Sequence, residues 1–230
     1  AECSTLQTGE ERPVEMDDSM MTVLKRLPGV SHVQRFAYKQ GILKTDSDFL
    51  GVVFKGVGQE VDSTFLHRHM VEGAMPHFSD ATAGNRILVS KVMADKLRLN
   101  CGARIFAYFI DDSGVRMRKF TISGIYQTNL SQYDNVMCFT DLYTAVKLNG
   151  WEPGMATGAE LAVNDFAQLD NVYRSVVKNV NRTTDRYGNT YSSKTIREIS
   201  PQIFSRLGLL DLNVWIILAI MMAAAAVTLI

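Results

Sequence analysis

The residues best suited to bind a metal ion lie in one stretch of the sequence. His67, His69, Glu72, His77 and Asp80 are close together, and imidazole and carboxylate groups are side chains that bind zinc. A helical zinc motif places its two histidines at positions i and i+4, whereas His67 and His69 alternate. The spacing gives little support to a metal site, and we expect neither a metal ion nor another cofactor.

The sequence gives equally little support to a catalytic nucleophile or a phosphate-binding loop. Ser90 and Ser131 have no flanking glycines of the kind that frame a nucleophile elbow, and no Ser/His/Asp arrangement follows from spacing. Gly51, Gly56 and Gly58 lack the spacing and the following helix of a phosphate-binding loop. We therefore expect a protein that is not an enzyme and does not itself hydrolyse ATP.

Composition excludes some classes of protein. Cys3, Cys101 and Cys138 are widely spaced and odd in number, which fits neither a disulfide framework nor paired metal ligands. The 230 residues include 24 basic and 24 acidic side chains, so no overall field attracts nucleic acid, and we expect none as a partner. With 47% hydrophobic and 21% charged residues, the chain is expected to form a globular domain.

The elements that carry these residues are predicted to be helices and strands in mixed order. Helices are expected at residues 20–27, after the capping residues Ser90 and Asp141, and after Asp165, which has Gln168 three residues later. Strands are expected from Val30, at 50–57, at 158–163, and in a hairpin of 104–110 with 115–125 around a tight turn at 111–114. Residues 182–193 are polar and predict an exposed loop or a weak hairpin.

The C-terminal run of the sequence predicts a membrane helix. In residues 214–230, Thr228 is the only residue that is not rich in hydrocarbon, and Trp215 suits the membrane interface. At the helical rise the run covers roughly 25 Å, a little less than the ~30 Å hydrocarbon core. A buried core helix is the alternative, but Met221, Met222 and the alanines after them leave no polar face. We expect a transmembrane segment that the chain enters but does not complete.

Two further expectations concern the ends of the domain. Residues 1–18 are polar and acidic and do not form a secretory signal, so an earlier membrane helix before Ala1 is the simplest way to place the domain. Ser200 and Pro201 fit the start of a helix that continues through residue 230, with Gly208 as the sole breaker. This helix is either a rigid rod that carries movement between membrane and domain or an ordinary tether.

Two motifs, taken in order, resemble the extracytoplasmic domain of the MacB/LolC/LolE/FtsX family of ABC transporter permeases. Residues 86–90 and 93–105 are similar to the family pattern isxxlAxxLxlxxGdxi. Residues 120–128, followed by Tyr133 and Asp134, are similar to fxvxGifxtgxxxyD. Asp141, Ala145, Leu148 and residues 158–161 fall where the later helix and strand of the family lie. The similarity covers most of residues 30–230, and Tyr133-Asp134 with the small residues favours the lipoprotein-releasing LolC/LolE branch.

The resemblance implies an α+β fold of the MacB-like periplasmic type. A discontinuous porter-like α/β subdomain would consist of residues 1–85 and 158–200. An inserted β-rich subdomain would occupy residues 86–157. Residues 201–230 would form a stalk and the start of a transmembrane helix.

The same resemblance implies a non-catalytic subunit of the bacterial inner membrane whose domain faces the periplasm. Its expected partners are a cytoplasmic ABC ATPase, a second permease subunit in a homo- or heterodimer, the membrane, and a lipoprotein or another periplasmic substrate. Phe204, Leu207, Leu210 and Trp215 are then candidates for a lipid-facing surface, with simple helix packing as the alternative. LolC captures its lipoprotein carrier with a longer hook than the turn at 111–114, so a LolE-like role fits better.

Two functions of different classes remain open from the sequence. One is transport, in which ATP-driven motion releases a lipoprotein or exports a macrolide or peptide. The other is an FtsX-like scaffold that activates a periplasmic cell-wall hydrolase. In the second case, residues 67–80 and 182–193 would be the docking surfaces.

Overall fold

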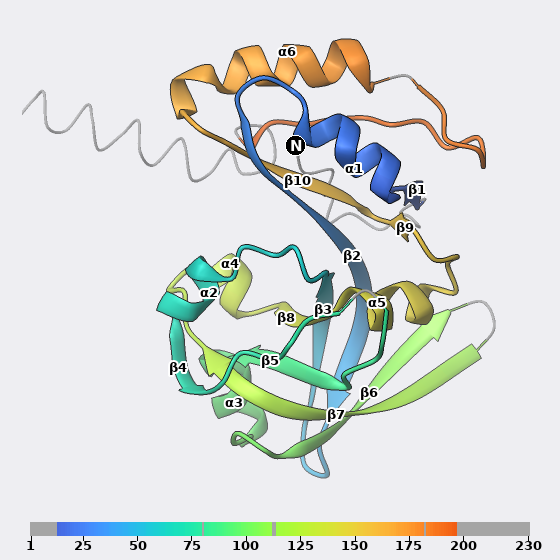
Figure 1. The fold of residues 1–230 in the computed structure, drawn as a ribbon. Coiled ribbons are helices and arrows are strands. Elements are labelled where there is room, and N and C mark those ends of the chain that lie inside the picture. Colours follow the sequence, from blue (N-terminus) through green and yellow to red (C-terminus); the bar gives the residue numbers. More distant parts are fainter. Residues whose placement is uncertain (1–12, 80, 112–113, 182, 197–230) are drawn as a thin grey trace, which may run out of the picture.

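The computed structural model describes residues 13–79, 81–111, 114–181 and 183–196 (Figure 1). It confirms the predicted mixture of helices and strands. The helices are α1 (Asp18–Lys25), α2 (Thr64–Arg68), α3 (Lys91–Leu97), α4 (Ser131–Asp134), α5 (Leu142–Asn149), the 3-10 helix η1 (Phe166–Gln168) and α6 (Leu169–Asn179). The strands are β1 (Val14–Glu15), β2 (Val30–Lys44), β3 (Phe49–Val57), β4 (Met70–Gly73), β5 (Arg86–Ser90), β6 (Arg104–Asp111), β7 (Gly114–Tyr126), β8 (Met137–Asp141), β9 (Met155–Ala156) and β10 (Gly158–Val163).

Six strands close into a barrel. The order β2-β3-β8-β5-β7 is continuous, and β6 pairs with both β7 and β2, which completes the ring. Closure leaves these strands without an open edge inside the ring. The interior is apolar and includes the ring contacts of Phe54 with Phe109 and Phe120, at centroid distances of 5.1 and 5.5 Å. Met93 and Leu97 of α3 belong to the same core, so this helix covers the barrel.

A second, smaller layer stands on the barrel, and we call it the helical layer. The first half of β2 pairs antiparallel with β10 over Val30–Phe36, and α1 and α6 lie over this pair (Figure 1). The apolar stripe of α6 supplies Val172 and Val176 to a separate core that also holds Leu24 of α1 and Val33 of β2. Because β2 runs through both parts, it links barrel and helical layer through the backbone.

Polar contacts reinforce the passage of β2 from one part to the other. Lys55 of β3 forms an ion pair with Glu160 of β10, and the Gln34 side-chain nitrogen donates to Glu160 Oε2 at 2.6 Å. Arg35 Nε lies 2.8 Å from Glu60 Oε1. These pairs are largely screened from solvent, so they tie the two parts more firmly than exposed pairs would.

Several sequence predictions of helix ends are confirmed. Ser90 Oγ accepts from the amide of Met93 at 3.1 Å, and Asp141 Oδ1 accepts from that of Thr144 at 2.8 Å. Gly150 ends α5 with a φ of 71°, a conformation that glycine adopts without strain. Asp165 caps as expected, although a 3-10 turn precedes α6.

Residues 183–195, which we call the strap, depart from the expectation of an exposed segment. A single bridge joins Thr184 to Thr190, which fits a weak hairpin. Tyr191, however, is 5% exposed and packs in the core of the helical layer. The polar composition of the segment hid this anchor, since one buried ring in a polar run gives no periodic signal.

The predicted division of the chain at residue 86 stays a prediction. The barrel core combines Val52 and Phe54 from before that position with Ile87 from after it. The predicted stalk and transmembrane helix at 201–230 lie outside the described residues. Along the described part of the chain, no helix has both the length and the apolar character needed to cross a membrane.

Candidate functional site

The described residues singled out for metal binding do not converge on a metal site. His69 Nδ1 lies 2.8 Å from the carbonyl oxygen of Phe65, and Asp80 lies outside the described residues. Among the residues that the structure describes, no group of three or more His, Cys, Asp or Glu side chains could hold a metal ion. Burial, and then the Glu72 carboxylate, raise the pKa of the Cys101 thiol, which disfavours the reactive thiolate.

The predicted lipid-facing residues Phe204, Leu207, Leu210 and Trp215 lie outside the described residues. Their role stays a prediction. The described part of the chain offers three other features with functional potential: a junction between its two ends, a pocket beside that junction, and an exposed apolar wall on the barrel.

The junction is built on Glu15, near the start of the described chain. Its amide nitrogen donates to Asp185 Oδ2 at 3.1 Å, and its carbonyl oxygen accepts from Tyr191 Oη at 2.6 Å. Its carboxylate Oε1 lies 2.8 Å from Arg186 Nε. One residue of the N-terminal segment thus binds the strap through three different groups. The two ends of the domain are thereby fastened to each other.

Local structure in the strap prepares it for these contacts. Asp185 Oδ1 accepts from the amides of Tyr187 at 2.9 Å and Asn189 at 2.8 Å, which fixes the turn and points Oδ2 toward Glu15. Burial acts to raise the pKa of Asp185, but hydrogen bonds from Asn189, Glu15 and Tyr187 outweigh it and lower the pKa below its ordinary value. The turn therefore depends on the ionised carboxylate.

Tyr191 is the apolar anchor of the junction. Burial, followed by the negative charges of Asp185 and Glu15, raises the pKa of Tyr191 to about 12. The phenol therefore stays protonated at neutral pH and keeps its donor for the Glu15 carbonyl oxygen. A buried tyrosine needs such a partner for its hydroxyl group.

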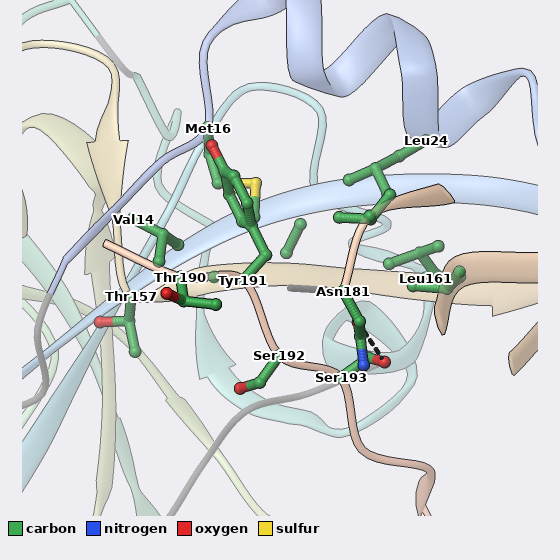
Figure 2. A pocket seen from close by; sticks show the side chains of 14 residues that line it. Val14, Met16, Leu24, Thr157, Leu161, Asn181, Thr190, Tyr191, Ser192 and Ser193 are labelled. Atoms are coloured by element: carbon green, nitrogen blue, oxygen red, sulfur yellow. Dashed lines mark hydrogen bonds between the residues drawn. The ribbon is translucent and has the colours of Figure 1, made fainter. Parts of the chain in front are cut away.

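A pocket of about 120 Å³ opens between the strap, α1, α6 and β10 (Figure 2). One part of its lining is apolar: Val14, Met16, Leu24, Ala159, Leu161, Val176 and Val180. The other part carries hydroxyl and amide groups: Thr157, Asn181, Thr190, Tyr191, Ser192 and Ser193. Among the residues that the structure describes, none with a charged side chain belongs to its lining. The pocket and the junction share Tyr191, so the two features are physically continuous.

The apolar wall is the outer face of the β6–β7 hairpin. Cross-strand register pairs Ile110 with Val115 and Tyr108 with Met117, so these side chains share the face opposite to the barrel core. Ile110 is 66% exposed, Val115 65% and Met117 50%. Lys44 Nζ lies 5.9 Å from the Tyr108 ring centroid, which brings positive charge to the wall. Exposed apolar patches of this kind mark interaction surfaces.

The fold of this chain is similar to that of solved extracellular and periplasmic domains. The chain resembles the extracellular domain of the noncanonic ABC-type transporter YknZ from Gram-positive bacteria, with a TM-score of 0.52 and 14% identity over 74% of this chain and 86% of that one. The periplasmic region of MacB from Actinobacillus actinomycetemcomitans gives a TM-score of 0.49 and 10% identity over 72% of this chain and 73% of that one.

No protein-family model matches the sequence, and a search of curated proteins finds no match. The finding is therefore a fold shared with the extracellular domain of YknZ, and the predicted mixture of helices and strands agrees with it. The first of these neighbours is the extracellular domain of an ABC-type transporter, and the second is a periplasmic region. The LolC/LolE branch stays a prediction.

The sequence did not reveal the junction. Glu15 and Tyr191 are 176 positions apart, and their contact uses a backbone carbonyl group that any residue would supply. The sequence goes part of the way to the apolar wall, because the alternation of residues along β7 predicts which side chains share a face. Knowing that its outer face stays uncovered required the tertiary structure.

Proposed function

We propose that this chain is the extracytoplasmic domain of a non-catalytic permease subunit of a bacterial ABC transporter. The observation that carries the proposal is the fold that it shares with the extracellular domain of YknZ over 74% of its length. The two sequence motifs that resemble the MacB/LolC/LolE/FtsX group of permeases are a second line of support, because they rest on residue patterns and not on the fold. ATP hydrolysis would take place in a separate cytoplasmic subunit.

In this proposal the junction couples the segments that enter and leave the domain. Both ends of the described chain meet at Glu15 and the strap, and the sequence predicts a membrane helix at residues 214–230, after the strap. A displacement of one segment would then move the other and tilt the helical layer against the barrel. The apolar wall of β6–β7 would receive a protein partner whose surface combines apolar and acidic side chains, since lysines flank the wall.

At a finer level, we propose lipoprotein release at the inner membrane, with a second permease subunit and a lipoprotein or its acyl chains as substrate. The support for this level is Tyr133-Asp134 together with the small residues of the motifs, which resemble the LolC/LolE branch. Phe204, Leu207, Leu210 and Trp215 would then face lipid. Activation of a cell-wall hydrolase and export of macrolides or peptides are the competing outcomes.

The test is to purify the full-length protein from its native membrane in mild detergent and to identify by mass spectrometry what accompanies it. An ATPase together with triacylated lipoproteins is the expected result. If an ATPase and a cell-wall hydrolase are found without a lipoprotein, lipoprotein release is overturned. The proposal of a permease subunit then still holds. The absence of any ATPase would overturn the proposal itself.

The role of the wall is tested in the same experiment with a pair of variants. Met117→Ser should lose periplasmic partners while the ATPase stays bound, because the wall lies on the barrel and not at the chain ends. Val92→Ser is the matched control, since Val92 is 45% exposed on α3, outside the wall. Equal partner recovery with both variants would exclude the wall as the docking surface.

A further inference from the structure

The pocket beneath the strap is large enough for a ligand but has no role in the proposed function. Its volume of about 120 Å³ is slightly below that of an engineered apolar cavity of about 150 Å³ that binds benzene. It would therefore accommodate a group of about the size of benzene or smaller. Its walls include residues of α1, α6, β10 and the strap, so an occupant would touch both helices, β10 and the strap.

The lining specifies the chemistry of that occupant. Leu24, Val176 and Val180 bury an aliphatic end, and the hydroxyl groups of Thr190 and Ser193 stand on the strap side (Figure 2). Asn181 Oδ1 accepts from Ser193 Oγ at 2.8 Å, so an amide and a hydroxyl group lie side by side in this part of the lining. Because none of the described lining residues is cationic, these residues would not compensate a carboxylate or phosphate for its lost hydration.

We propose that this pocket is a binding site for a small neutral amphiphile with a short aliphatic end and one hydroxyl or amide group. Binding closes the contact between strap and helices, because the lining joins Val14 and Met16 of the N-terminal segment to Tyr191 of the strap. The ligand thus tightens the junction that fastens the two chain ends. The inference stands apart from the proposed function, since it depends on the pocket and not on the ATPase partner.

The experiment uses the full 230-residue chain in detergent micelles and titrates it with pentan-1-ol, followed by two-dimensional NMR. Saturable shifts of amides in the strap and in α6 are expected, together with slower hydrogen exchange at Tyr191. Pentanoate, which has the same chain length but carries a charge, should bind more than about tenfold more weakly, as expected for an uncompensated charge at a buried site.

Matched substitutions on α6 locate the site. Val176→Phe fills the pocket and should weaken pentan-1-ol binding by more than about tenfold, roughly the contribution of two buried CH₂ groups. Val177→Phe changes the next residue, which is 38% exposed and outside the lining, and should bind like the wild type. If Val176→Phe fails to fold, Val176→Ala serves instead, because the enlarged pocket should favour benzyl alcohol over pentan-1-ol relative to the wild type.

Two results would contradict this proposal. Non-saturable shifts, or shifts of the same size in Val176→Phe and Val177→Phe, would overturn the site. Equal binding of pentanoate and pentan-1-ol would overturn the proposed ligand chemistry. Neither result bears on whether an ATPase accompanies the protein, so failure of this inference is distinguishable from failure of the proposed function.

Discussion

The barrel and the helical layer are held together in different ways. The barrel is a closed ring of strands around a single aromatic and aliphatic core, in which Phe54 contacts both Phe109 and Phe120. The helical layer has a smaller core, a pocket beneath the strap, and a junction in which the strap binds Glu15. Regions with few buried apolar contacts open at lower free energy than a closed core. The comparison indicates a rigid platform that carries an adjustable layer at the chain ends.

The largest effect on stability is expected from the barrel core. Phe54→Ala should lower the free energy of unfolding by about 3 to 5 kcal/mol, because the lost ring leaves a cavity that the closed barrel cannot collapse. Urea denaturation followed by circular dichroism measures this change. Phe49→Ala is the control on the same strand, since Phe49 is 67% exposed, and it should change stability by about 0.5 kcal/mol or less. Similar losses for the two variants would contradict the described core.

Removing the strap anchor should have a smaller and more local effect. Tyr191→Ala deletes a buried ring and the hydrogen bond to the Glu15 carbonyl oxygen, so about 2 to 4 kcal/mol of stabilisation of the strap should be lost. Limited proteolysis should then cut within residues 183–195 first, while the barrel stays intact. Simultaneous cleavage throughout the barrel would show that the two parts unfold together and would remove the distinction between them.

Acid should weaken the junction before it affects the barrel. The folded-state pKa of Asp185 lies below its ordinary value, so its stabilising effect is present above about pH 4 and is lost as the pH falls through the folded-state pKa. Asp185→Asn removes the titrating group. The stability difference between wild type and variant in urea denaturation should therefore be larger at pH 7 than at pH 3, and a constant difference would exclude this role of the carboxylate.

The smallest effect on stability is expected on the apolar wall. Ile110→Ser replaces a side chain that is 66% exposed, so the free energy of unfolding should change by about 0.5 kcal/mol or less. Thermal unfolding followed by circular dichroism checks this. A loss comparable with that of Phe54→Ala would mean that the wall is covered within the domain itself and cannot be a docking surface.

The sequence predicts those features of the fold that depend only on residues close together in the chain. The caps at Ser90 and Asp141, the glycine end of α5 and the strand 158–163 follow from residue type and short-range spacing. Barrel closure was not predicted, because it depends on the pairing of Ile42 with Tyr108 across a long sequence separation. The same reason hid the junction, in which Glu15 contributes backbone groups that carry no sequence signal.

The two ends of the described chain are fastened to each other through Tyr191 and Glu15, independently of the barrel. Hydrogen exchange of the full chain, compared between wild type and Tyr191→Phe, tests it directly. Loss of the one hydrogen bond should speed exchange about fivefold to tenfold both in the strap and in residues 14–25, with barrel amides unchanged. Tyr187→Phe, on the exposed side of the strap, should leave all rates unchanged. Faster exchange in the strap alone, with residues 14–25 unaffected, would contradict the coupling of the two ends.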